Sequence, residues 1–130
     1  MNLLDENIRH DQGEPLRRWR IKFRRFVVDV EYPGIKDSQI IPVLHRLTRP
    51  TFFTHDQDYF RRELVHPGYC LVWLDLFDGD AAWFIRAFLK HRLFSTRAQR
   101  MEVVARVHPG GVAFWKSLKP QLNKVSWGND

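Results

Sequence analysis

The sequence predicts an α/β protein with a mainly parallel central sheet covered by helices on both faces, a three-layer sandwich. Apolar segments rich in β-branched and aromatic residues alternate along the chain with segments of helical period, which is the pattern of successive βα units. The segment 69–74 is almost entirely apolar, as expected for a strand buried on both faces of a parallel sheet. With 130 residues, 44% of them hydrophobic, the chain can bury one core, and we expect a single domain over residues 1–130.

The N-terminal elements follow from short-range signals. Leu3 and Leu4 form a short first strand, and Pro15 suits the first turn of a short helix over 16–23. The β-branched segment 26–30 is the next predicted strand, and a Tyr-Pro-Gly turn closes it. Asp37 or Ser38 can cap a helix with apolar residues at 40, 41, 43, 44 and 47, in which Pro42 is tolerable only near the beginning.

The remaining elements continue the alternation. After Arg49-Pro50 we expect a strand at 51–54 and a short polar helix around 59–64, followed by a His-Pro-Gly turn and the strand at 69–74. The segment 80–89 is amphipathic at helical period, with Asp80 available as its cap. A last strand at 101–108 precedes a Pro-Gly-Gly turn and a tail rich in Trp and Lys. Leu4, Val28, Phe53 and Val72 are expected in the interior of the sheet.

Acidic side chains follow two of the predicted strands. Asp5 ends the first strand, and Asp56 and Asp58 follow the strand at 51–54. Because the carboxyl ends of parallel strands share one edge of a sheet, Asp5 and Asp56 can converge there, and Asp37 can reach the same edge from its helix start. Carboxylates are the ligands that hard divalent cations prefer. The alternative is structural, since Asp37 can act as a helix cap and Asp58 as an ordinary loop residue.

The chain is basic, with a formal net charge of +6, which favours a polyanionic partner such as nucleic acid. A dense basic run interleaved with Trp19 and Phe23 lies close to the first strand and suits single-stranded nucleic acid. Its members are Arg17, Arg18, Arg20, Lys22, Arg24 and Arg25. The alternative is a solvated helix face whose aromatic residues belong to the core. Trp115 and Trp127 could serve a partner protein or a homodimer.

Several classes of site lack support in the sequence. Cys70 is the single cysteine, which excludes an internal disulfide and favours a buried thiol in a reducing, cytoplasmic compartment. No apolar run is long enough to span a membrane. The histidines lack zinc spacing, glycine-rich nucleotide loops are absent, and the serines do not suggest a nucleophile. His55 is expected to pack on the opposite strand face from its neighbours rather than act in acid–base chemistry.

Taken in order, three motifs resemble those of the small PIN-like nucleases. They are Leu-Leu-Asp-Glu-Asn at 3–7, Asp-Ser-Gln-Ile-Ile at 37–41 and Thr-His-Asp-Gln-Asp-Tyr-Phe at 54–60, with Pro-Gly-Tyr-Cys-Leu-Val at 67–72 continuing the match. In the shorter bacterial branch of that family, Leu-Leu-Asp-Glu-Asn opens the chain and Thr-x-Asp-x-Asp-Phe lies past its middle. The resemblance covers residues 2–74. Two features depart from it: Gly-Glu-Pro at 13–15 interrupts the first helix, and Tyr59 stands beside the second Asp, where the family tends to have Phe.

The resemblance implies a PIN-like fold and a metal-dependent endoribonuclease, often the toxin of a toxin–antitoxin pair, so an antitoxin protein is an expected partner beside RNA. The family's acidic site carries over onto Asp5, Asp37, Asp56 and Asp58, with Glu6 as a further ligand of Mg²⁺ or Mn²⁺. One alternative is a catalytically silent PIN-like module that binds RNA or protein. Another is a basic interaction protein whose acids only cap helices and turns.

Overall fold

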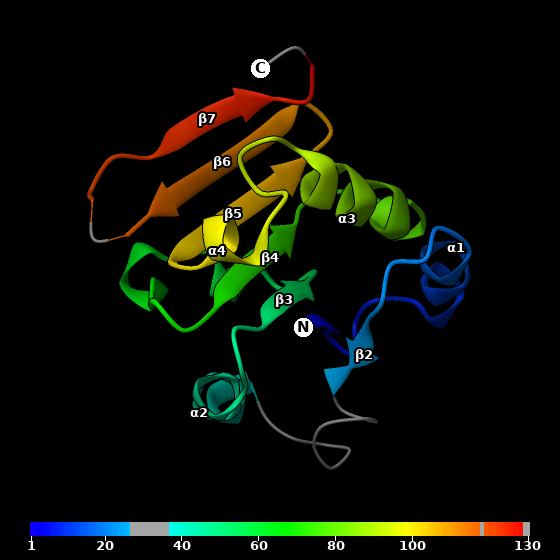
Figure 1. Cartoon of the computed structure of the whole chain (residues 1–130), viewed down its shortest axis with the longest axis horizontal. Coiled ribbons are helices and arrows are strands. Elements are labelled where there is room, and N and C mark those ends of the chain that lie inside the picture. The colour runs from blue at the N-terminus through cyan, green and yellow to red at the C-terminus, as the bar shows by residue number, and fades with distance from the viewer. Residues whose placement is uncertain (27–36, 118, 129–130) are drawn as a thin grey trace.

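The computed structural model describes residues 1–26, 37–117 and 119–128, including only the backbone of Asp37 and Ser38 (Figure 1). Within this part of the chain there is one seven-stranded sheet in the order β2-β1-β3-β4-β5-β6-β7. Its strands are β1 (Asn2–Leu4), β2 (Arg24–Arg25), β3 (Thr51–Thr54), β4 (Cys70–Leu74), β5 (Val103–His108), β6 (Gly111–Lys116) and β7 (Asn123–Ser126). The strands from β2 to β5 pair in parallel, and β6 and β7 are antiparallel. An α/β fold with a mainly parallel sheet is therefore confirmed.

Helices lie on both faces of the sheet. They are α1 (Gly13–Arg18), α2 (Asp37–Arg46), α3 (Ala81–Lys90) and α4 (Arg97–Arg100). Alternate strand residues separate two cores, because successive side chains of a strand point to opposite faces. Leu4 and Phe53 pack in one core with side chains of α1 and α3, whereas Leu3 and Phe52 pack in the other with side chains of α2. Of the residues expected in the interior, Leu4, Phe53 and Val72 are completely buried, and Val28 lies outside the described residues.

The predicted position of the first helix, at 16–23, is wrong. The helix forms at Gly13–Arg18, and the chain leaves it through Arg20, which has a φ of 61°. The predicted strand at 26–30 begins earlier, as β2 at Arg24–Arg25, and residues 27–30 lie outside the described part. The helix expected from Asp37 is confirmed as α2, but Pro42 lies in its second turn rather than near its beginning.

Two predictions for the chain after β3 are also wrong. The polar helix at 59–64 is replaced by two 3₁₀ turns, Gln57–Tyr59 and Arg62–Leu64, because Phe60 and Arg61 between them adopt non-helical backbone angles. The tail after His108 forms strands β6 and β7, and β6 hydrogen-bonds to β5 across a tight turn at Pro109 and Gly110. By contrast, α3 and the strands β3, β4 and β5 lie within about two residues of their predicted positions.

Candidate acidic site at the carboxyl edge

The sheet changes direction between β1 and β3. From β1 the chain moves to β2 on one side, and β3 then lies on the other side of β1, with β4 beyond it. In open α/β sheets such a switch point leaves a crevice outside the carboxyl ends of the two strands, and ligands bind there. Asp5 follows β1, and Thr54 is the last residue of β3, so both lie at this crevice.

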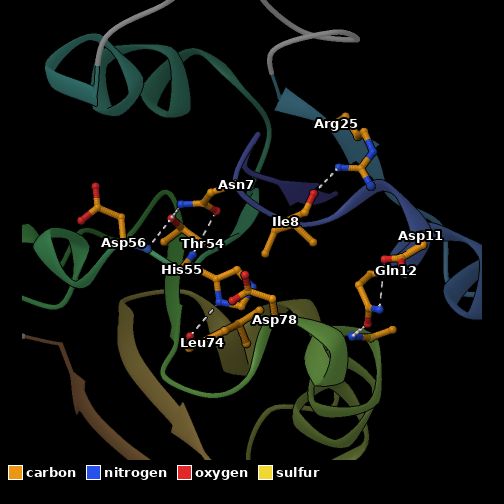
Figure 2. A network of polar contacts seen from close by, with 11 residues as sticks. Asn7, Ile8, Asp11, Gln12, Arg25, Thr54, His55, Asp56, Leu74 and Asp78 are labelled. Atoms are coloured by element: carbon orange, nitrogen blue, oxygen red, sulfur yellow. Dashed lines mark hydrogen bonds and ion pairs between the residues drawn. The ribbon is translucent and has the colours of Figure 1, made fainter.

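The hydroxyl of Thr54 connects the two acidic segments. It donates a hydrogen bond of 2.7 Å to Asp5 Oδ2, from a position 49 residues further along the chain. It accepts hydrogen bonds from the backbone N–H of Asp56 at 3.0 Å and from Asn7 Nδ2 at 3.2 Å. Asn7 Oδ1 in turn accepts from the backbone N–H of His55 (Figure 2). Neither Thr54 nor Asn7 was predicted as a site residue, although Asn7 belongs to the motif at 3–7 and Thr54 to the motif at 54–60.

Asp5 is a buried carboxyl among other acids. Only 4% of it is exposed, and burial raises its pKa above the usual value. Hydrogen bonds from Thr54 and from the backbone N–H of Glu6 oppose that shift, whereas the charges of Glu6 and Asp56 add to it. The charges of Glu6 and Asp56 therefore act on Asp5, as expected for an acid that lies beside other acids at one edge of the sheet.

Asp56 and Asp58 follow β3 in a 3₁₀ turn. Asp56 is half-buried, and its Oδ1 accepts a hydrogen bond of 2.9 Å from the backbone N–H of Asp58. Asp56 thus caps the turn Gln57–Tyr59, while its carboxylate extends away from Thr54 in Figure 2. Asp58 is exposed. Asp37 begins α2, and its side chain is not among those described.

The acidic side chains are of the right chemical type to bind a hard cation, but too few of them lie close together. Carboxylate oxygens are suitable ligands for Mg²⁺ or Mn²⁺. Among the side chains that the structure describes, however, no group of three His, Cys, Asp or Glu lies close enough together to hold a metal ion. Asp5 and Asp56 supply two donors, Glu6 is an exposed neighbour, and a complete shell would need a further ligand such as Asp37.

His55 lies between the acids and β4. Its Nδ1 is 3.0 Å from the carbonyl oxygen of Leu74, and since a carbonyl only accepts, Nδ1 carries the proton. Its Nε2 is buried, forms no hydrogen bond with the described residues, and lies 3.9 Å from Asp78 Oδ1. The ring is thus anchored at the carboxyl end of β4 (Figure 2).

The basic run divides into surface and interior residues. Arg17, Arg20 and Lys22 are exposed and line a cavity of about 830 Å³ together with His10, Ile21, Phe23 and Arg25. Arg25 is only 7% exposed, and its guanidinium donates to the carbonyl oxygens of Ile8 and Arg9, which ties β2 to the loop after Asp5. Arg18 and Arg24 are exposed and do not line the cavity.

Comparison with known proteins found no matching family model, no similar curated protein and no similar solved structure. In the described part of the chain, no helix is both long enough and apolar enough to cross a membrane. What the geometry defines is therefore a class: an α/β protein with acidic side chains at the switch point of its sheet and a basic cavity beside α1 and β2.

Proposed function

We propose that the protein is a divalent-metal-dependent ribonuclease of the PIN-like type, with its site at the switch point between β1 and β3. The observation that carries the proposal is the buried Asp5, whose pKa is raised by its burial and further by the charges of Glu6 and Asp56. Gathering acids at a crevice costs stability, and perturbed acids of this kind concentrate at functional sites.

Asp5 and Asp56 would hold the metal, with Asp37 and Glu6 as further ligands. A bound Mg²⁺ or Mn²⁺ lowers the pKa of a water ligand and neutralises charge that develops on the phosphate. Thr54 orients the carboxyl of Asp5 through its 2.7 Å hydrogen bond. The exposed cations Arg17, Arg20 and Lys22 would attract the phosphate backbone of RNA to the side of the sheet that carries α1 and β2.

The second candidate is a PIN-like module that binds RNA or protein without cleaving it. One observation favours it: each oxygen of Asp5 already accepts a hydrogen bond, from the backbone of Glu6 or from Thr54, and Asp56 caps its own turn. In that case the acids serve the local fold. An antitoxin and a homodimer stay predictions that no observation tests.

The two functions differ in cleavage and in metal binding. Cleavage of single-stranded RNA is measured with Mg²⁺, Mn²⁺ or EDTA, and melting is followed with and without Mn²⁺. For the ribonuclease, Mn²⁺ at about 100 times its Kd stabilises the wild-type protein by about 2.7 kcal/mol. Asp56→Asn should abolish cleavage, spare the fold and slightly raise the Tm of the metal-free protein, because one repelling charge is removed.

Asp80→Asn is the matched control. Asp80 is exposed and makes no side-chain hydrogen bond to the start of α3, so this variant should cleave like the wild type. Melting that ignores Mn²⁺, together with full cleavage by Asp56→Asn, would remove the acids from the mechanism. RNA binding with no cleavage under any of the metal conditions would favour the silent module.

A further inference from the structure

A row of aligned residues crosses the sheet from the acidic site to its far edge. In the strand register, Thr54 of β3 lies opposite Trp73 of β4, Trp73 opposite Arg106 of β5, Arg106 opposite Ala113 of β6, and Ala113 opposite Lys124 of β7. Neighbouring strands are about 4.8 Å apart, so the row extends about 19 Å from Thr54. We call these five residues the Thr54–Lys124 row.

The row faces away from the core formed with α1 and α3. On each strand from β4 to β6, the residues on either side of the row member belong to that core, and Val125 beside Lys124 packs against it. The row therefore lies on the same face as α2, beyond the core that α2 covers. Its far end is accessible, since the side chain of Arg106 is 39% exposed and Lys124 is exposed, and Trp73 is half-buried. Thr54 and Ala113 are buried and contribute to the row only through their place in the register.

The row and its margin combine cations with aromatic rings. The Arg106 guanidinium lies 5.6 Å from the centroid of the Trp73 ring, and Asp75 holds it with two contacts of 2.8 Å. Phe60 packs against Trp73 and stacks on Trp115 at a centroid distance of 4.6 Å.

The positive potential at the far end of the row extends to a neighbouring histidine. Arg106, His108 and Lys124 line one cavity of about 360 Å³. Burial lowers the pKa of His108, the charges of Arg106 and Lys124 lower it further, and Asp75 opposes the shift. Asp75 thus offsets only part of the positive charge at this end.

We propose that the Thr54–Lys124 row is a binding platform for single-stranded RNA, which it leads across β7, β6, β5 and β4 to the acids at β3. Cations that meet phosphates and rings that stack on bases are the usual means of holding a single strand. An acidic protein would satisfy the cations, but it does not account for a row that begins at the hydroxyl holding Asp5.

The proposal deepens the ribonuclease function and rests on it for the direction of the strand, whereas binding can be measured without cleavage. The test follows fluorescence anisotropy of a labelled single-stranded RNA oligonucleotide in EDTA over a range of salt concentrations. The double variant Arg106→Gln/Lys124→Gln should bind at least tenfold more weakly, and the slope of log K against log salt should fall by about 1.4, since two phosphate contacts are lost.

The control is Lys90→Gln/Lys119→Gln, which removes the same charge from two exposed lysines outside the row. It should change the affinity by less than about twofold, because screened charges at a distance contribute little. The single variant Lys124→Gln keeps the test valid if the double variant misfolds. Lys124 is an exposed residue of an edge strand, so its replacement should not disturb the fold. The slope of this variant should fall by about 0.7.

The aromatic part of the platform has a separate signature. Trp73→Leu, after a melting curve shows that it is folded, should weaken binding while leaving the salt slope unchanged, since stacking releases no counterions. A duplex of the same sequence should bind more weakly than the single strand, because its bases are not available for stacking.

Two results would overturn the platform: equal RNA affinity of the row variant and its control, or displacement of RNA by polyglutamate as efficient as that by unlabelled RNA. The second result would identify an acidic protein as the occupant. Loss of cleavage in Asp56→Asn with unchanged binding by the row variant would reject the platform and keep the ribonuclease. If the protein never cleaves RNA but the row variant binds RNA more weakly than the wild type, the ribonuclease function is rejected and the platform is kept.

Discussion

At the scale of single residues, Thr54 shows why a polar side chain lies at the end of an otherwise apolar strand. It is completely buried, and its hydroxyl serves as donor to Asp5 and acceptor for Asp56 and Asn7. A buried hydroxyl with such partners stabilises the fold, and here it also fixes the relative positions of two acids that are far apart in the sequence. The apolar stem of the same residue completes the row of side chains on β3.

Thr54→Val keeps the shape and removes the hydroxyl. It leaves a buried carboxylate oxygen and a backbone N–H without this partner, so we expect a loss of about 1–3 kcal/mol of stability. RNA cleavage should fall at the same time, because Asp5 loses the group that orients it. Thr54→Ser retains the hydroxyl and should restore most of the cleavage activity. The measurements are urea unfolding and initial rates; equal activity of the Val and Ser variants would contradict the positioning role.

The raised pKa of Asp5 gives a pH dependence with a definite sign. Because the folded protein holds the Asp5 proton more tightly than the unfolded chain does, the neutral carboxyl contributes stability below its ordinary pKa of 3.8. That contribution is lost as the pH rises through the higher pKa of the folded state. The free energy of unfolding of Asp5→Asn, minus that of the wild type, should therefore increase between about pH 3 and about pH 7.

Asp80→Asn, which also removes one carboxylate, corrects this comparison for the general loss of negative charge. A difference for Asp5→Asn that stays level or decreases with pH would show that the ionised carboxylate of Asp5 is not disfavoured in the folded protein.

At the scale of elements, the pairing of β6 with β7 depends on one glycine. Gly111 has a φ of +152°, and a Cβ atom at this position would lie 2.0 Å from the backbone oxygen of Val125 in β7. Only glycine allows β7 to approach so closely. The same pairing carries Lys124 and so completes the far end of the Thr54–Lys124 row.

Gly111→Ala should lower the stability by more than the 1–3 kcal/mol that an unfavourable φ costs by itself, since the clash is with backbone that cannot rotate away. Gly110→Ala is the matched comparison, because its Cβ would meet only the ring of His108, at 3.2 Å. Thermal melting should show a large decrease in Tm for the first variant and a small one for the second. Similar values for both would mean that β7 is not held in this register.

The sequence predicted the elements whose signals are local. The strand 51–54 is a β-prone run that is buried at every position, and α3 has a clear helical period. The strand leads directly to Asp56. The β5–β6 hairpin and the β6–β7 pairing were not predicted, although the Pro-Gly-Gly turn between β5 and β6 is a hairpin signal. Strand β7 is mostly polar and exposed, so its pairing with β6 is not visible as an apolar period.

The acidic site was predicted in part for a similar reason. The rule that parallel strand ends share one edge brought Asp5 and Asp56 together, but the hub role of Thr54 depends on hydrogen bonds across the strand pair. The burial of Arg25 was missed because the run of arginines appeared uniform in sequence. Only the fold shows which member points toward the loop carbonyls.

At the scale of the whole molecule, two basic surfaces lie toward opposite ends of the sheet. One lines the cavity beside α1 and β2, at one end of the sheet, and the other lies on β5 and β7, at the opposite end. The acids lie between them in the strand order. An electrostatic field of this form would draw a polyanion across the carboxyl edge.

Charge reversal tests the cavity beside α1. Arg17→Glu/Arg20→Glu should weaken binding of single-stranded RNA and reduce its salt slope by about 1.4 or more, because both side chains line the cavity. Arg18→Glu, on the same helix but outside the cavity, should have a smaller effect per charge. Anisotropy titrations at several salt concentrations measure both. Equal effects per charge would indicate that the basic run from Arg17 to Arg25 is an ordinary solvated surface.

The order of the strands also has a kinetic consequence. Pairing of β5, β6 and β7 joins neighbours in the chain, whereas Asp5 and Thr54 meet only after a segment of 49 residues has closed. Closing long loops costs more entropy than forming hairpins, so local pairs have the advantage during folding. A complete chain that refolds from its unfolded state would then acquire its basic antiparallel end before its acids come together.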